Sequence, residues 1–356
     1  MLILDKYREV LKNHKPFEHT KSRYNFEELA DVSGPYEFAK TAIMRALAAA
    51  LEDGSPRFSP LLGAKGSGKT HFYFHLKNIE KDENPQWMIV YIPPPEKEFI
   101  ENIPFYIYKH IIEQKGDLLL YLAADKIMNE YQRGGILRKP SIEELIRYVL
   151  RDYPGITADI VKSIFIYGYD RNRKQKAKRW LFGEELTEEE MSILGVARPH
   201  LKDDDIVFSA LKILTKYTDR MLLLFFDDLQ TVYMEQGYAA IGAYLEHIKR
   251  FYNELENITC IGACLTEKWD NVVKSLDDAM RGRLEPEVEI KKFDLSDLEE
   301  FYLQTMDNFW IQHELSIPED RYYPLSAIII RQVHQKSEGN PQKAIQFLQD
   351  KISSVS

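Results

Sequence analysis

One eight-residue segment constrains this chain more than any other part of its 356 residues. Residues 63–70 read GAKGSGKT and match the pattern G-x-x-x-x-G-K-[ST] at every specified position. Glycines there let successive backbone N–H groups turn inward around a polyphosphate, because a side chain would collide or forbid positive φ. A Gly-rich surface turn is the alternative. An apolar run at residues 58–62 and an unbroken helix candidate at residues 71–76 favour the phosphate loop, since a helix N-terminus then faces the anion.

The side chains that complete the loop suit a triphosphate and its metal ion. Lys69 would meet the β- and γ-phosphates as a point charge, and the Thr70 hydroxyl would ligate Mg²⁺. The sequence therefore predicts a nucleotide site with ATP and Mg²⁺ as cofactors. The residues expected to bind the nucleotide are Gly63, Ala64, Lys65, Gly66, Ser67, Gly68, Lys69, Thr70 and His71.

A second element should supply an acidic partner for the metal ion. Residues Met221–Phe226 are all apolar and are followed by Asp227 and Asp228. Such a run can form a buried central strand, and ligands bind at the carboxyl ends of strands in open α/β sheets. Asp227 would hold Mg²⁺ directly or through water, and Asp228 would orient or deprotonate the attacking water. For this segment alone, an ordinary strand followed by a turn is the alternative.

Short apolar runs alternate with longer segments of helical periodicity along most of the chain. The strand candidates are residues 58–62, 87–92, 221–226, 258–265 and 288–290. The helix candidates between them are residues 36–51, 99–114 and 238–255. Continuous apolar strands separated by helices indicate a parallel sheet that is covered on both faces. The predicted fold class is therefore α/β, a P-loop NTPase sheet with helices on both faces.

Two regions depart from this alternation. Residues 117–205 are charged and helical in pattern, and we expect them to form an all-helical insertion. The helix candidates in it are residues 118–132, 142–151 and 188–194. From residue 295 onward the chain is helical again, with a capped start expected at Ser296 and a last helix at residues 342–352.

These patterns divide the chain into two expected domains. Residues 1–294 would form an α/β nucleotide-binding domain that contains the insertion. Residues 295–356 would form a small all-α lid.

Several motifs resemble those of one ATPase family. LFFDDLQ at residues 224–230 resembles the Walker B segment of AAA+ ATPases of the DnaA and origin-recognition initiator clade, in which a second acidic residue follows the first. The strand candidate 258–265 ends at Thr266, where these ATPases carry a polar sensor-1 residue near the γ-phosphate. The resemblance covers residues 24–116 and 206–350 and implies assembly with copies of the chain or with homologous subunits.

Two further segments follow in the family's order. SLDDAMRGRL at residues 275–284 resembles the box that presents an arginine finger to a neighbouring subunit. Arg283 fits that place best, with Arg281 as reserve, because a planar charge can stabilise negative charge on a transferred phosphoryl group. EGNPQKA at residues 338–344 resembles the sensor-2 turn of the lid, but Gln342 stands where the family places an Arg, and Lys343 is the nearest replacement.

Plainer interpretations of these positions stay open. Thr266 would then be only a strand-end hydroxyl, and Arg281 and Arg283 would be solvated surface charges.

The insertion carries a second resemblance and a basic segment. AKRWLFGEEL at residues 177–186, followed by LGV, resembles the Trp-Leu-x-Gly-Glu stretch of ATP-binding proteins of BREX-type phage-resistance systems. Six positive charges lie within residues 171–179, beside Tyr167, Tyr169 and Trp180. Such a mixture can contact phosphates and stack on bases, so DNA contact through Arg171 to Arg179 is one interpretation. A solvated hairpin, charge-paired with the glutamates that follow, is the other.

Composition limits the partners and the compartment. A formal net charge of −9 means that the chain as a whole does not attract polyanions, so nucleic-acid contact must be local. Cys260 and Cys264 are the only cysteines, and in a strand their Cα atoms would be about 13 Å apart, beyond disulfide reach. No apolar run approaches the roughly 18 residues of a membrane span. We expect a soluble cytoplasmic protein in a reducing compartment with no membrane partner.

Three function hypotheses follow. The first is an oligomeric AAA+ ATPase that couples ATP binding and hydrolysis to a DNA transaction, such as defence, mobile-element control or replication, through DNA or protein partners. The second is a slowly hydrolysing nucleotide switch or signalling scaffold, because Gln342 replaces the lid Arg and Asp228 stands where many relatives carry the longer Glu. The third, a small-molecule P-loop kinase, fits less well because the acidic pair and the arginine box come late in the chain.

Overall fold

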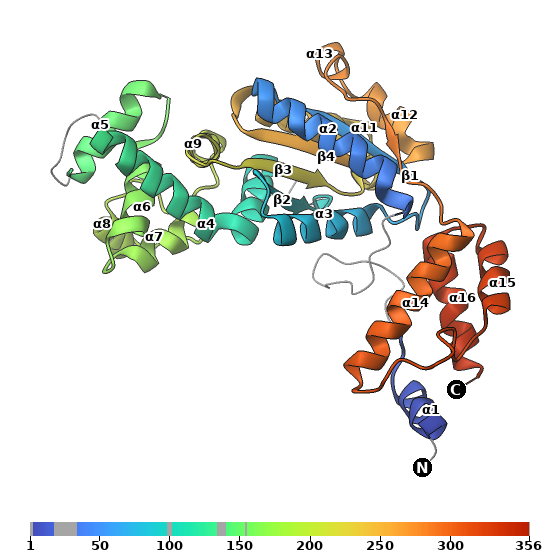
Figure 1. Ribbon diagram of the computed structural model, residues 1–356. Helices are drawn as coiled ribbons and strands as arrows, with labels where there is room; N and C mark the ends of the chain where they lie inside the picture. Colours follow the sequence, from blue (N-terminus) through green and yellow to red (C-terminus); the bar gives the residue numbers. More distant parts are fainter. Residues whose placement is uncertain (1–2, 18–33, 98–101, 134–139, 154, 356) are drawn as a thin grey trace.

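A five-stranded, all-parallel sheet with the strand order β2-β3-β4-β1-β5 forms the centre of the molecule. The computed structural model describes residues 3–17, 34–97, 102–133, 140–153 and 155–355 (Figure 1). The strands are β1 (Phe58–Gly63), β2 (Trp87–Ile92), β3 (Met221–Phe226), β4 (Ile258–Leu265) and β5 (Val288–Glu289). Each coincides with a strand candidate of the sequence, and the predicted α/β fold class is confirmed.

The strands place their side chains alternately in two apolar cores. On β3, Leu222, Leu224 and Phe226 belong to one core, whereas Leu223 and Phe225 belong to the other. The second core is covered by α2 (Glu37–Asp53) and α3 (Lys69–Glu83). The first core is covered by α4 (Ile103–Arg133), α9 (Asp204–Lys216), α10 (Leu229–Gln236), α11 (Tyr238–Glu254) and α12 (Thr266–Lys274).

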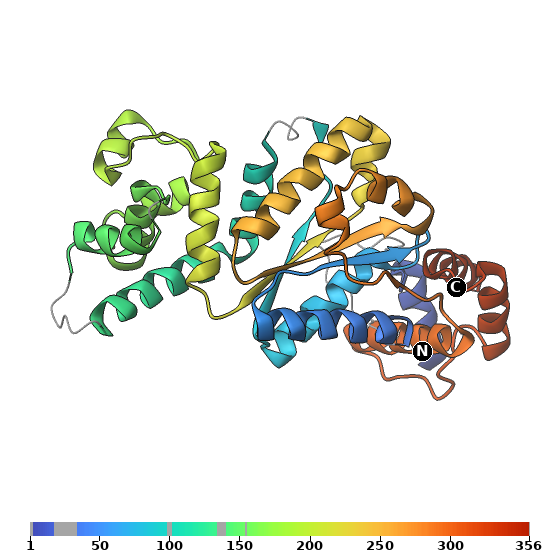
Figure 2. The same ribbon diagram turned by 90° about the horizontal axis from the view of Figure 1, so that it is seen from above.

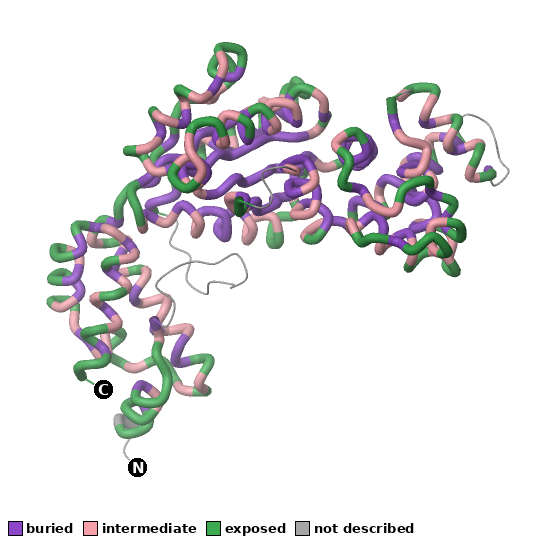
Figure 3. The backbone as a smooth tube through the Cα atoms, turned by 180° about the vertical axis from the view of Figure 1, so that it is seen from behind, coloured by how far each residue is buried: buried purple, intermediate pink, exposed green. Residues whose placement is uncertain are grey.

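Burial on both faces explains why the strands are continuous apolar runs rather than alternating ones. Figure 2 shows α2 and α11 on opposite sides of the sheet, and in Figure 3 the strands are the buried centre of the tube.

Helix α4 runs without a break from Ile103 to Arg133, so residues 103–114 and 118–132 are helical as predicted but belong to one helix rather than two. Residues 99–101 of the first lie outside the described residues. Gly116 does not end the helix but provides space, because a Cβ there would lie 2.8 Å from Ile112 Cγ1 and 3.0 Å from Phe182 Cζ. The first half of α4 packs on β2, and the second half enters the insertion.

The insertion is helical throughout its described residues and lies at the opposite end of the sheet from the C-terminal helices (Figures 1 and 2). Its helices after α4 are α5 (Ile142–Asp152), α6 (Ala158–Tyr169), α7 (Lys174–Leu181) and α8 (Glu188–Leu194). Trp180 of the BREX-like stretch is fully buried, and its indole N–H donates to the Arg198 carbonyl over 3.0 Å. This tryptophan therefore belongs to the core of the insertion.

A third apolar core holds the C-terminal helices together with the N-terminal one. It joins α1 (Ile3–Asn13), α14 (Leu295–Gln312), α15 (Ala327–Ser337) and α16 (Pro341–Ser353). The Tyr7 ring packs edge-on against Trp310 at 5.1 Å between centroids, and its hydroxyl donates to the Ser316 carbonyl over 2.8 Å. The expected division at residue 294 did not include this packing of α1.

The helix cap expected at Ser296 is wrong by two residues. Asp294 is the N-cap of α14, and the side chains of Asp294 and Asp297 each accept the other's backbone N–H at 2.8 Å. This is a capping box in which Asp replaces the usual Ser and Glu.

Two further expectations concern β4 and the helices as a group. Cys260 and Cys264 are buried, free thiols on β4, as their spacing predicts. Among the residues that the structure describes, no helix has both the length and the apolar character required to cross a bilayer.

Candidate nucleotide-binding site

The phosphate loop connects the carboxyl end of β1 to the N-terminus of α3. Gly66 and Gly68 have φ values of +76° and +97°, which residues with a side chain rarely adopt. The 15-residue helix α3 directs its partial positive charge and its unpaired backbone N–H groups toward the loop. Residues 63–70 therefore have a backbone that can surround an anion.

Lys69 is buried at the start of α3. Its ammonium donates to the carbonyls of Gly63 at 3.0 Å and Ala64 at 3.2 Å. Burial lowers the pKa of Lys69, and the charges of Asp228 and Asp227 oppose that shift. Since the side chain is flexible, the ammonium can exchange these carbonyls for phosphate oxygens.

The phosphate loop and the end of β3 meet at one carboxylate. Thr70 Oγ1 donates to Asp227 Oδ2 over 2.6 Å, and the Tyr91 hydroxyl donates to the same oxygen over 2.8 Å. Asp227 is buried, and burial followed by the charge of Asp228 raises its pKa to about 6. Carboxylate and hydroxyl oxygens are ligands that Mg²⁺ accepts, so Thr70 and Asp227 fit as its protein ligands.

Asp228 begins α10 in the left-handed region, with φ at +46°. A non-glycine residue in this region costs of order 1–3 kcal/mol, and such residues cluster at functional sites. Asp228 Oδ1 accepts a hydrogen bond from Gln230 Nε2 at 2.8 Å, and Gln230 Oε1 accepts the Leu265 N–H at 3.0 Å. The buried Gln230 side chain therefore links the ends of β3 and β4.

Sequence reasoning gave no role to Gln230 or Tyr91. Gln230 stands inside the LFFDDLQ segment, two residues after Asp228, and that position was its only signal. Tyr91 pairs with Phe225 in the register of β2 and β3, two residues before Asp227. A long side chain at that register position reaches the carboxylate, but the register is not visible in the sequence.

An aromatic residue covers the loop from the N-terminal side. Tyr36, in the 3₁₀ turn η1 (Gly34–Tyr36), donates its hydroxyl to the Gly68 carbonyl over 3.5 Å. Its ring stacks on His71 at 5.5 Å between centroids. His71, one of the expected nucleotide contacts, thus lies beneath Tyr36 on the first turn of α3.

The lid contacts the phosphate loop directly through its sensor-2-like turn. The Gln342 backbone N–H donates to the Gly66 carbonyl over 3.3 Å, and Asn340 Nδ2 donates to the Lys65 carbonyl over 2.9 Å. A Cβ on Gly66 would lie 2.6 Å from Gln342 Oε1. The side chain that replaces the family's Arg is therefore beside the loop.

Two expected catalytic residues lie away from the loop contacts. Exposed Thr266 follows β4 at the same sheet edge, but its hydroxyl donates to Glu289 Oε1 over 3.2 Å. Arg283 is exposed after α13 (Asp278–Arg281), where it donates to Asn253 Oδ1. Arg281 donates to the backbone carbonyls of Val273 and Lys274 at the end of α12. Neither arginine forms a hydrogen bond or ion pair with residues 63–70, all of which the structure describes.

Three of the six positive charges of the basic segment are paired within the chain. Its ion pairs join Arg173 to Asp170, Lys178 to Asp117, and Arg179 to Glu184 and Glu190. Only Arg179 pairs with the glutamates that follow the segment, as the charge-paired hairpin interpretation predicts. Arg171, Lys174 and Lys176 form no ion pair with any described residue, and the Lys174 ammonium lies over the Tyr167 ring.

Comparisons with known proteins concern the fold. No protein-family model matches the chain, and no curated protein matches it. Among solved structures, the chain is similar to the ORC1 protein of Aeropyrum pernix in complex with DNA, at 13% identity and a TM-score of 0.45. That match covers 96% of this chain and 64% of the ORC1 chain, so this chain spans less than two thirds of its length.

Two other solved structures have similar folds. One is a Walker-type ATPase of Pyrococcus abyssi, at 16% identity and a TM-score of 0.40, covering 93% of this chain and 69% of that one. The other is the ORC2 protein of Aeropyrum pernix in ADPNP-ADP complexes, at 10% identity and a TM-score of 0.38, covering 92% and 70%. At these identities the likeness does not extend to activity or partners.

Proposed function

We propose that this chain is an AAA+ ATPase that binds Mg·ATP between residues 63–70 and Asp227. The observation that carries the proposal is the 2.6 Å separation of Thr70 Oγ1 and Asp227 Oδ2. Adjacent oxygen ligands of an octahedral Mg²⁺ lie about 2.9 Å apart, given Mg–O distances of about 2.0–2.1 Å. The two oxygens are therefore close to the separation that one shared ion requires.

Some residues of the proposed site would bind the nucleotide, and others would take part in hydrolysis. Bound Mg²⁺ would neutralise charge on the phosphates. Lys69 would hold the β- and γ-phosphates, and Asp228 would orient the attacking water. Arg283, exposed on the surface, would act on the nucleotide of a neighbouring subunit, so hydrolysis would require assembly.

Titration with a fluorescent ATP analogue, with Mg²⁺ or with EDTA, tests the binding proposal. We expect Lys69→Ala to abolish binding in both conditions, and Thr70→Ala to abolish the gain in affinity that Mg²⁺ gives. Thr187→Ala is the matched control, because Thr187 caps α8 in the insertion. Equal affinities for the wild type and Lys69→Ala would reject the site.

The role of Arg283 has its own test. Arg283→Ala should abolish ATP turnover and leave ATP binding nearly intact. Retained turnover in a demonstrated oligomer would remove that role and leave Arg283 as a surface charge.

We further propose that the ATPase cycle acts on a DNA transaction, in replication, defence or mobile-element control, through DNA or a protein partner. Arg171, Lys174 and Lys176 support direct DNA contact, because they are the positive charges of residues 171–179 that carry no ion pair within the described residues. Imaging the protein on duplex DNA with a non-hydrolysable ATP analogue tests this. A nucleotide-dependent ring or filament supports the proposal, and its absence favours action through a protein partner.

A slowly hydrolysing switch is the second candidate, and the environment of Asp228 favours it. The Gln230 amide donates to Asp228 Oδ1, so one of the two oxygens that could accept a proton from water is already bonded within the chain. Phosphate release from purified protein with Mg·ATP distinguishes the two candidates. Steady turnover supports the ATPase, whereas a retained nucleotide with negligible phosphate release supports the switch.

A further inference from the structure

Tyr91 is held from helix α4 through its backbone. It lies on β2, the outermost strand on one side of the sheet. Its backbone N–H donates to Gln114 Oε1 over 3.0 Å, and Gln114 Nε2 donates back to the Tyr91 carbonyl over 2.7 Å. The Gln114 amide thus takes the place of a neighbouring strand at this point of the open edge.

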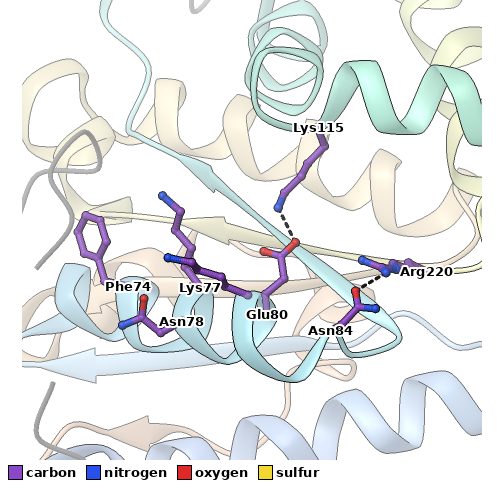
Figure 4. Close-up of a pocket in the computed structure, with 8 residues that line it drawn as sticks. Phe74, Lys77, Asn78, Glu80, Asn84, Lys115 and Arg220 are labelled. Carbon is purple, nitrogen blue, oxygen red and sulfur yellow. Dashed lines mark hydrogen bonds and ion pairs between the residues drawn. The ribbon is translucent and has the colours of Figure 1, made fainter. Parts of the chain in front are cut away.

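The same α4 turn also holds helix α3. Lys115 pairs with Glu80 at 2.5 Å, and the other Glu80 oxygen accepts the Ile89 N–H of β2 over 3.3 Å. Figure 4 shows this pair bridging α4 and α3 across a cavity of about 350 Å³. Helix α4 therefore contacts both the strand that carries Tyr91 and the helix that begins at Lys69.

The Tyr91 side chain is fixed as firmly as its backbone. Its ring lies 5.0 Å from that of Tyr73 and stacks on Phe225 at 6.2 Å, and the residue is 8% exposed. From this position the hydroxyl donates to Asp227 Oδ2, while Asp227 Oδ1 accepts the Asp228 N–H over 2.9 Å. Both carboxylate oxygens are therefore held by donors from the chain.

We propose that Tyr91 is a positioning residue for the metal-binding carboxylate of Asp227, and that Gln114 sets the position of Tyr91. The proposal rests on the Mg·ATP site proposed above. Partners that hydrogen-bond a ligating group typically change metal affinity about 10- to 100-fold when they are removed.

Tyr91→Phe tests the first part, since it removes the hydroxyl and keeps the ring. We expect the Mg²⁺ concentration that half-saturates the complex with a fluorescent ATP analogue to rise about tenfold or more. Affinity for the same analogue in EDTA should stay within about twofold, because the hydroxyl acts on the metal ligand alone. Tyr108→Phe is the matched control, since its buried hydroxyl donates to the Leu181 carbonyl in the insertion. It should change neither value.

The outcomes separate the inference from the proposed function. No Mg²⁺ effect on nucleotide binding in the wild type would overturn the proposed site. A normal Mg²⁺ effect with the same half-saturation in Tyr91→Phe would overturn the role of Tyr91 alone. Equal losses in Mg²⁺ and in EDTA would assign Tyr91 a merely structural role and would also overturn the proposal.

Gln114→Leu and the double variant test the second part. If Gln114 acts through Tyr91, Gln114→Leu should also raise the half-saturating Mg²⁺ concentration, and its effect should disappear in the Tyr91→Phe background. Glu113→Gln, one position away on the same helix and exposed, is the control. Additive effects of the two changes would show that Gln114 acts by another route and would overturn this part.

Discussion

Substitutions at two glycines with positive φ can distinguish the effect of backbone strain from the effect of the contact between the phosphate loop and the lid. Gly66 and Gly54 have φ values of +76° and +69°. A Cβ on Gly66 would meet Gln342, whereas a Cβ on Gly54 would meet nothing within 4 Å.

We expect Gly54→Ala to lower the free energy of unfolding by about 1–2 kcal/mol, because it forces a side chain into the left-handed region. Gly66→Ala should lower it by more, because its Cβ would also lie 2.7 Å from Gln342 Cβ. Only Gly66→Ala should also weaken nucleotide binding. We expect its Kd for the nucleotide to rise about tenfold or more, and a tenfold rise is a loss of about 1.4 kcal/mol of binding free energy. Urea unfolding and nucleotide titration measure the two effects. If Gly54→Ala weakened binding equally, the contact with the lid would not matter to the loop.

A half-buried histidine should make stability depend on pH. His110 lies on α4 with its ring edge-on to Tyr106 at 4.6 Å. Burial, followed by the charge of Lys109, lowers its pKa to about 4. An unfolded histidine titrates near 6.5, so between about pH 6.5 and pH 4 the unfolded chain binds a proton that the folded chain does not. Stability from this group therefore falls as pH falls through that window.

His110→Gln should flatten this dependence. We expect the urea midpoint of the wild type to drop more between pH 7.5 and pH 5 than that of the variant. Carboxylates that titrate in both proteins cancel in the difference. Equal drops would mean that His110 is protonated in the folded state at pH 5.

The predictability of site residues depends on where their partners lie. The roles of Lys69 and Thr70 could be predicted because both belong to a loop with a fixed local sequence pattern. The role of Asp227 could be predicted because it follows an apolar strand. Tyr91 and Gln230 bond across strands, and their roles depend on the β2–β3 and β3–β4 pairing. The pairing of these strands cannot be predicted from the local hydrophobic pattern of the sequence.

At the scale of elements, burial decides what the sequence reveals. Strands β1 to β4 are buried on both faces, so each reads as a mainly apolar run with clear ends. The prediction gave α4 as two helix candidates, residues 99–114 and 118–132, on either side of the expected start of the insertion. The structure instead uses Gly116 for close packing with Phe182, a tertiary contact that outweighs helix propensity.

The pairing of charges in the insertion predicts which of them can contact DNA. We expect Arg171→Ala with Lys176→Ala to reduce the slope of log affinity against log salt by about 2, at about 0.9 per phosphate contact. Arg179→Ala should leave that slope unchanged, because Arg179 already pairs with Glu184 and Glu190. Binding to duplex DNA across a salt series is the measurement. An unchanged slope in the double variant would give the segment a structural role only.

At the scale of the whole molecule, the two ends of the chain share one core. Helix α1 and helix α16 contact each other, although more than 300 residues separate them. Hydrophobic periodicity carries no information about contacts between segments so far apart in the chain. Helix α1 was therefore assigned to the α/β domain from the sequence. The apolar cores predict that the lid with α1 unfolds separately from the insertion, because Trp310 lies in the third core, whereas Trp180 lies in the first core, which the insertion shares with one face of the sheet.

Tyr7→Ala tests this independence. The change removes a buried ring that packs on Trp310 and should cost the lid about 3–5 kcal/mol, the usual range for a core aromatic. In a background that keeps Trp310 as its single tryptophan, Tyr7→Ala should lower the urea concentration at the midpoint of the fluorescence change. In a background that keeps only Trp180, Tyr7→Ala should leave that midpoint unchanged. Tyr7→Phe keeps the ring and loses only the bond to Ser316, so it should cost about 1 kcal/mol. Equal shifts at both tryptophans would instead mean that the sheet transmits unfolding from the lid to the insertion, and the chain would be one cooperative unit.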